Sequence, residues 1–184
     1  MKRSLSFLLA VLLCLTVGAC GSSPLAPLGE PYTFSFQPTD EGVEDFLKYE
    51  SAKAEIHKND ICWNITPDFM REHADYQVFK YGDTGDAYLL YGDTVYPIGP
   101  YFGGFGITSL ALADLNGDGL YEVYYTCSAG SGISRSFVGY FDPADKTDHL
   151  LGNRLWVQMM LVCREGELTA TLADVTSEED RYLI

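Results

Sequence analysis

The sequence is short of positive charge. Its 184 residues include 12 Lys and Arg against 26 Asp and Glu, which gives a net charge of −14 with histidine neutral. Such an excess of acid argues against binding to nucleic acid or to anionic lipid surfaces, because both repel a carboxylate-rich protein. It is compatible with cation binding and with solubility outside the cell.

Histidine and recognisable catalytic motifs are also scarce. His57, His73 and His149 lie on separate segments, without the helical spacing of zinc ligands in metalloproteases. The segment around Ser131 lacks the Gly-x-Ser-x-Gly pattern of serine hydrolases, and the glycine-rich residues 101–106 lack the lysine of a phosphate-binding loop. We therefore favour a protein that is not an enzyme. The alternative is a secreted hydrolase that uses acidic residues in a cleft, although no two of its many carboxylates stand out as a pair.

A long apolar run occurs at the N-terminus, but it is too short to span a bilayer comfortably. Lys2 and Arg3 precede apolar residues 5–17, the pattern of a signal peptide. Residues 17–20, Val-Gly-Ala-Cys, resemble a bacterial lipobox, which implies that residues 1–19 are removed and that Cys20 is lipidated. Residues 20–30 are rich in Gly, Ser and Pro, which predicts a flexible tether. We expect a lipoprotein anchored to the cell membrane and facing away from the cytoplasm; the alternative is an uncleaved anchor.

Few cysteines remain for disulfide bonds. Cys14 leaves with the predicted signal peptide and Cys20 is the expected lipid site. Cys62, Cys127 and Cys163 then allow at most one intramolecular disulfide. The alternative is that they act as small buried apolar residues.

Residues 114–122 read Asp-Leu-Asn-Gly-Asp-Gly-Leu-Tyr-Glu. Calcium binds six to eight oxygens at roughly 2.3–2.6 Å, and a tightly curled loop can aim alternate residues at one ion. Gly119 allows the sharp bend that such a loop needs. The alternative is an ordinary hairpin turn without an ion, since Asp, Asn and Gly are common turn residues. The predicted ligands are Asp114, Asn116, Asp118, the Leu120 carbonyl and Glu122.

The residues around this loop are typical of strands. Residues 105–113 and 121–127 are rich in β-branched and aromatic side chains, and an EF-hand would need Glu where Tyr125 stands. Phe105-Gly106, the apolar strand and the acidic loop together resemble an FG-GAP or VCBS-type repeat over residues 101–128. That resemblance implies a calcium-binding hairpin loop on one blade of a β-propeller in a secreted or cell-surface protein.

The rest of the chain predicts an antiparallel meander behind one or two helices. Apolar spacing predicts a helix over about residues 40–58, and Thr66 and Pro67 predict the cap and first turn of a short helix that ends near His73. We expect the fold class α+β, mainly β: a sandwich, barrel or propeller-like sheet in one domain, residues 31–184. The predicted strands outside the calcium hairpin are residues 32–36, 61–65, 76–81, 87–91, 94–98, 133–141, 155–163 and 168–173.

A second segment of interest is residues 128–136. Its Ser131, Ser134 and Arg135 form a candidate ligand loop, because Arg can clamp a carboxylate or phosphate while small neighbours let a ligand approach the backbone. The alternative is a flexible hairpin loop with an exposed Arg. An intervening strand of residues 121–127 separates this loop from the calcium loop by roughly 20 Å. We expect a binding or interaction module with an extracellular protein or carbohydrate partner; an inhibitor or adhesion module is a further reading.

Overall fold

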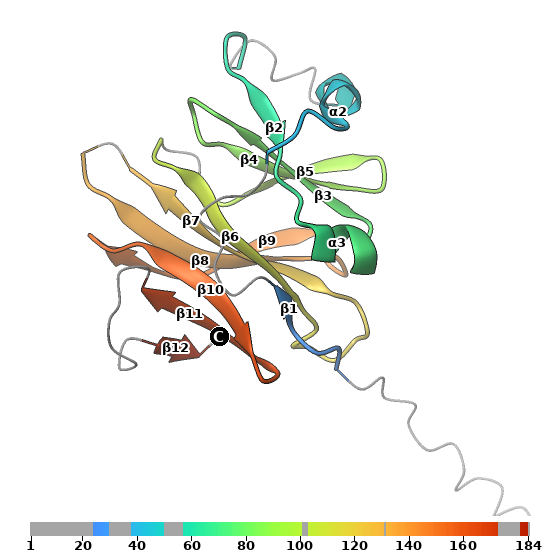
Figure 1. Cartoon of the computed structure of the whole chain (residues 1–184), viewed down its shortest axis with the longest axis vertical. Coiled ribbons are helices and arrows are strands. Elements are labelled where there is room, and N and C mark those ends of the chain that lie inside the picture. Colours follow the sequence, from blue (N-terminus) through green and yellow to red (C-terminus); the bar gives the residue numbers. More distant parts are fainter. Residues whose placement is uncertain are drawn as a thin grey trace, which may run out of the picture.

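The computed structural model describes residues 24–29, 38–49, 57–100, 103–130, 132–172 and 181–183 (Figure 1). Several predictions lie outside these residues: the signal peptide, Cys20, the strand at residues 32–36 and Ser131. Among the described residues, no helix is both long and apolar enough to cross a membrane.

The chain folds into three antiparallel sheets, and the central one lies between the other two (Figure 1). The first sheet contains β2 (Cys62–Asn64), β3 (Tyr76–Tyr81), β4 (Ala87–Tyr91) and β5 (Thr94–Ile98) in that order. The central sheet has the order β1 (Leu28–Gly29), β6 (Gly106–Ala113), β7 (Glu122–Ala129), β8 (Arg135–Asp142) and β9 (Thr147–Leu155). The third contains β10 (Met159–Arg164), β11 (Glu167–Leu172) and β12 (Arg181–Leu183).

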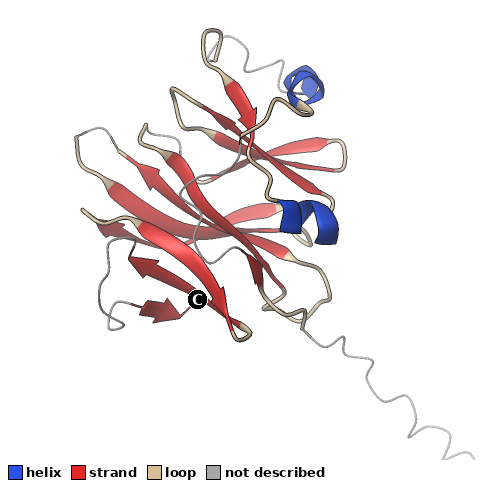
Figure 2. Ribbon diagram, in the orientation of Figure 1, coloured by secondary structure: helices blue, strands red, loops and turns tan. Residues whose placement is uncertain are grey.

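The predicted fold class is confirmed. The described residues form mainly strands with two short helices, α2 (Val43–Tyr49) and α3 (Asp68–His73), and the antiparallel sheets do not close into a barrel (Figure 2). The bounds of β3, β4 and β5 agree with the predicted strands. The Gly-Asp pairs at residues 82–83 and 92–93, which favour turns, separate three runs of aromatic and aliphatic residues and so mark these boundaries.

Two local predictions were wrong. Residues 155–163 are not one strand, because Leu155 ends β9, Trp156 turns the chain with a φ of 62°, and β10 begins at Met159. Thr66 does not cap α3: Pro67 is the N-cap and makes no side-chain bond there, whereas the Thr66 hydroxyl accepts a hydrogen bond from the Val78 N–H at 2.8 Å.

Two residues of the predicted tether belong to the central sheet. Leu28 and Gly29 form β1, which pairs with Leu112 and Ala111 of β6. Apolar contact with the core accounts for this, since Leu28 packs against the buried cluster between the first and central sheets.

Two buried clusters among the described residues lie on the two faces of the central sheet. Every residue of β6 and β7 is buried. On one face Leu110, Leu112 and Tyr125 pack against the first sheet and Met70 of α3. On the other face, Ala111 and Tyr124 belong to a separate cluster with the third sheet. A strand pair buried on both faces explains why the sequence on either side of residues 114–122 is apolar without clear alternation.

Hydroxyl groups join the third sheet to the central one. Ser109 accepts a hydrogen bond from the Leu161 N–H at 2.8 Å, and Ser136 accepts one from the Met159 N–H at 3.0 Å. Both serines are buried. They therefore satisfy backbone groups of β10 that would otherwise be unpaired between two packed sheets.

None of the three cysteines that the structure describes forms a disulfide bond. Cys62 and Cys127 are buried and Cys163 is half-buried. Burial raises the pKa of the Cys163 thiol to about 11, which keeps it protonated at neutral pH. The interpretation of these residues as small apolar side chains holds.

A close approach at Gly139 fixes how β8 passes the core. The Tyr125 hydroxyl lies against Gly139 and donates to the Asp148 carboxylate at 2.8 Å, and Asp148 also accepts from the Gly99 N–H at 3.0 Å. The register of β8 and β9 shifts at this point, between Val138 and Gly139. The missing side chain at Gly139 thus leaves room for a buried tyrosine that links the first and central sheets.

We expect Gly139→Ala to lower the free energy of unfolding by about 1–3 kcal/mol, because the new Cβ would lie 2.6 Å from the Tyr125 Cζ and 2.8 Å from the His149 carbonyl oxygen. Gly152→Ala is the matched control, since a Cβ there meets no atom within 4 Å. Urea denaturation of both variants measures the difference. Equal midpoints for the two variants would refute this account of the close approach.

Candidate metal centre

The loop between β6 and β7 is organised by Asp114. This side chain is fully buried, and its carboxylate accepts hydrogen bonds from the N–H groups of Gly117, Asp118 and Gly119 at 2.7, 3.1 and 2.9 Å. Gly117 and Gly119 have φ values of 77° and 86°, which side-chain-bearing residues rarely adopt. The two glycines and these three hydrogen bonds therefore bend the loop around the Asp114 carboxylate.

The exposed rim of the loop is built from Asn116, Asp118 and Leu120. Asn116 accepts from the Asp118 N–H at 2.8 Å and its amide donates to the Asp118 carboxylate at 3.3 Å. The other Asp118 oxygen accepts from the Leu120 N–H at 2.8 Å, and the Leu120 side chain is exposed. Asn116 and Asp118 thus lie side by side at the open side of the loop.

Glu122, the first residue of β7, lies at the buried side of the loop. Only 1% of this residue is exposed. Its Oε2 accepts a hydrogen bond from the Leu115 N–H at 3.0 Å, whereas its Oε1 is buried without any hydrogen-bond partner. A buried carboxylate oxygen without a partner is costly. Among the observations at this loop, the unpartnered Oε1 atom of Glu122 most favours a bound cation.

The electrostatics of Glu122 agree with this assignment. Burial raises the pKa of its carboxyl group, and the neighbouring carboxylates of Asp142, Asp114 and Asp118 raise it further, while the bond from Leu115 opposes them. Asp142 is close because β7 and β8 pair with Val123 opposite Phe141, which puts Glu122 and Asp142 at the same end of the sheet. Without a counter-ion, negative charge at Glu122 is therefore unfavourable.

The structure brings together three of the predicted ligands. Asp114, Asp118 and Glu122 each offer a carboxylate oxygen, and these oxygens lie within 4.8 Å of one another. Asn116 adjoins the group through Asp118. The donors are all oxygens, which suits a hard divalent cation and does not suit zinc in a structural site.

The same loop holds the N-terminal segment of the domain. The Leu25 N–H donates to Asp114 at 3.2 Å, and Pro24 lies against Gly117. The Tyr121 hydroxyl approaches the Ala26 carbonyl oxygen at 3.5 Å. These contacts continue into β1, so the loop and the start of the domain are one structural unit (Figure 1).

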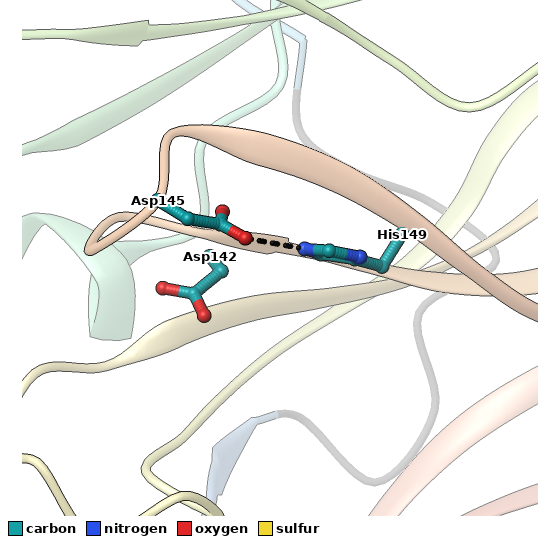
Figure 3. A group of neighbouring side chains, drawn as sticks. All are labelled: Asp142, Asp145 and His149. Atoms are coloured by element: carbon teal, nitrogen blue, oxygen red, sulfur yellow. Dashed lines mark hydrogen bonds and ion pairs between the residues drawn. The ribbon is translucent and has the colours of Figure 1, made fainter.

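A second acidic group lies at the β8–β9 turn, which is at the same end of the central sheet. It consists of Asp142, Asp145 and His149 (Figure 3). Asp145 contacts the His149 ring nitrogen at 3.0 Å, and the other Asp145 oxygen accepts from the Thr147 N–H. Asp142 accepts from the Ala144 N–H. By sequence spacing His149 is separate from the other two histidines, and the short turn that follows Asp142 and Asp145 is the signal that places it beside two aspartates.

The His149 ring also stacks on Tyr140, with ring centroids 4.8 Å apart. Its orientation is thus fixed by aromatic packing and one carboxylate. None of the three residues is fully buried. None of these three side chains has a buried carboxylate oxygen without a hydrogen-bond partner, unlike Glu122. The group is therefore a weaker candidate for a metal site than the loop at Glu122 and is explained as a hydrogen-bonded turn.

The candidate ligand loop lies at the opposite end of the central sheet. The Ser134 carbonyl accepts from the Trp156 N–H at 3.0 Å, and exposed Arg135 starts β8, paired with Ala129 and Leu155. Ser131 lies outside the described residues. Strand β7 spans the distance between the two loops, roughly 23 Å at the usual rise per residue.

No protein-family model, curated protein or solved structure matches this chain.

We expect Asp114→Ala to lower the free energy of unfolding by roughly 2–4 kcal/mol even in the presence of a chelator, because three loop N–H groups and that of Leu25 lose their acceptor. Asn116→Ala is the control on the exposed rim and should cost less than about 1 kcal/mol. Denaturant titration in excess chelator makes the comparison. A loss no larger than that of Asn116→Ala would mean that Asp114 does not organise the loop.

Proposed function

We propose that this chain is a surface-tethered lipoprotein whose single β-rich domain is stabilised by one calcium ion and acts as a binding or interaction module. The observation that carries the calcium assignment is the buried, unpartnered Oε1 of Glu122 beside the carboxylates of Asp114 and Asp118. The resemblance to FG-GAP and VCBS-type repeats belongs to this proposal. It is supported by the position of the loop between two adjacent antiparallel strands.

The residues that would hold the ion are Asp114, Asp118 and Glu122, with the Asn116 side-chain oxygen, the Leu120 carbonyl and water as further oxygen donors. Calcium accepts such a flexible set of oxygens, whereas magnesium requires a stricter octahedron. The ion would neutralise two buried carboxylates and a third on the rim. We expect weak affinity, on the order of 10⁻⁴–10⁻³ M, as in other extracellular modules.

A structural role for the ion follows from the contacts of the loop. The loop joins two completely buried strands and holds Pro24 and Leu25 through Gly117 and Asp114. An ion there would fasten the start of the domain to its central sheet. In a lipoprotein, that is the point where the tether from the membrane meets the folded part.

The hydrogen bonds of the carboxylates support a binding module over a hydrolase. Those of Asp114, Asp118, Asp142 and Asp145 each accept backbone hydrogen bonds from their own loop or turn. Such bonds shape the loops and favour a structural role over acid–base chemistry on a substrate. The expected partner is an extracellular protein or carbohydrate, bound away from the calcium end.

Millimolar calcium should raise the melting temperature of the wild-type chain, since an ion that binds only the folded state stabilises it by mass action. In Glu122→Gln and Asp118→Ala the rise should disappear. Arg135→Ala, roughly 23 Å away along β7, is the matched control and should keep the full response. Differential scanning calorimetry with calcium or chelator measures all four proteins. A wild-type curve that is indifferent to both additions would rule the site out.

The anchor has its own test. Cys20→Ser should move the protein from the washed membrane fraction to the soluble fraction without changing its melting temperature, because the predicted tether separates the lipid from the domain. Immunoblots of the fractions show the distribution. A variant that stays with the membrane after washing would mean an uncleaved anchor in place of a lipid.

A further inference from the structure

Two carboxylates lie directly opposite each other where β7 and β8 meet the calcium end of the central sheet. The pairing of Val123 with Phe141 continues by one residue to Glu122 and Asp142, which are both strand residues. Opposite residues of an antiparallel pair have Cβ atoms about 4.5–5.5 Å apart, and like charges in such a pair are destabilising. The sheet therefore holds two acidic side chains together at a position where they repel.

The next pair along these strands shows that both side chains share one face of the sheet. Tyr124 lies opposite Tyr140, and the two rings stack with their centroids 5.1 Å apart. Alternate residues of a strand point to the same face. Glu122 and Asp142 lie two residues beyond these tyrosines, so they continue the same row of side chains.

No basic side chain among the described residues forms an ion pair with either carboxylate. The Oε1 atom of Glu122 is buried without a hydrogen-bond partner. Asp142 is half-buried; one of its oxygens accepts from the Ala144 N–H at 2.7 Å, and the other makes no hydrogen bond with the described residues. Each member of the pair thus has one oxygen that the described part of the chain leaves without a partner.

Asp142 is associated more closely with Glu122 than with its own turn. Figure 3 shows its carboxylate pointing away from Asp145 and His149, which contact each other. Burial is the largest cause of the raised pKa of Glu122, and the largest contribution from another carboxylate comes from Asp142. The nearest acidic influence on Glu122 therefore comes from outside the loop that sequence spacing identifies.

We propose that Asp142 is a further ligand of the ion at Glu122, so that the metal centre joins the β6–β7 loop to the end of β8. This inference rests on the proposed calcium site and adds a ligand from a different strand. Calcium binds about six to eight oxygens, and with the donors of the loop alone water completes this set. A carboxylate oxygen of Asp142 would take the place of one water. The shared cation would then replace the repulsion between the two opposite carboxylates by attraction to both.

Isothermal titration calorimetry of the full chain with calcium chloride tests the contribution to affinity. Asp142→Asn keeps the size of the side chain and an acceptor for the Ala144 N–H, and it should weaken calcium binding by about tenfold, since affinity depends on the number of charged ligands. Asp145→Asn removes the same charge from the same turn and is the matched control. Its effect should stay below about twofold at physiological ionic strength, because salt screens an exposed charge. Circular dichroism shows whether each variant is folded.

A count of the water molecules on the bound ion separates a ligand from a distant charge. Europium is a hard cation that can replace calcium, and its luminescence lifetimes in light and heavy water give the number of waters that it carries. Asp142→Ala should raise this number by about one, because water fills the position that the carboxylate leaves. Asp145→Ala should leave the number unchanged.

The possible failures are distinguishable. A wild-type chain that binds no calcium overturns the calcium site and the role of Asp142 together. If the wild-type chain binds calcium but Asp142→Asn binds it as tightly as Asp145→Asn does, only the role of Asp142 is overturned. An unchanged water count in Asp142→Ala likewise overturns direct ligation by Asp142 and leaves the site at the loop intact.

Discussion

The structure depends on the burial of β6 and β7 on both faces. A strand pair of this kind cannot form a stable sheet with one face in water, because each exposed apolar face would lose the stabilisation that burial supplies. The first sheet covers one face through Leu110, Leu112 and Tyr125, and the third covers the other around Ala111 and Tyr124. The three-layer arrangement in Figure 1 follows from this requirement.

The same burial creates the electrostatic problem at the end of the central sheet. Asp114 follows β6 directly and Glu122 begins β7, so both carboxylates are drawn out of water with the strands that carry them. Asp114 is compensated by backbone N–H groups. Glu122 is compensated on one oxygen only. A divalent cation would supply the partner that the second Glu122 oxygen lacks. Without that partner, burial and the neighbouring carboxylates raise the pKa of Glu122.

The sequence was most informative where local signals were complete. Runs of aromatic and aliphatic residues between Gly-Asp turns located β3 to β5, and ligand spacing predicted the carboxylates that meet at the β6–β7 loop. It failed at β9, whose residues 150–155 are exposed on both faces and therefore follow no apolar period. Nothing in the sequence marks the approach of Asp142 to Glu122 either. That approach depends on the β7–β8 register, which tertiary packing sets.

Calcium binding at Glu122 can be measured directly by equilibrium dialysis of the wild-type chain and of Glu122→Gln against calcium at low ionic strength. We expect one bound ion per wild-type chain, and none for Glu122→Gln at the same concentration of free calcium. That variant keeps the size of the side chain and removes its charge. Absence of binding to the wild-type chain, or equal binding to both proteins, would contradict the claim that this buried carboxylate is part of a metal centre.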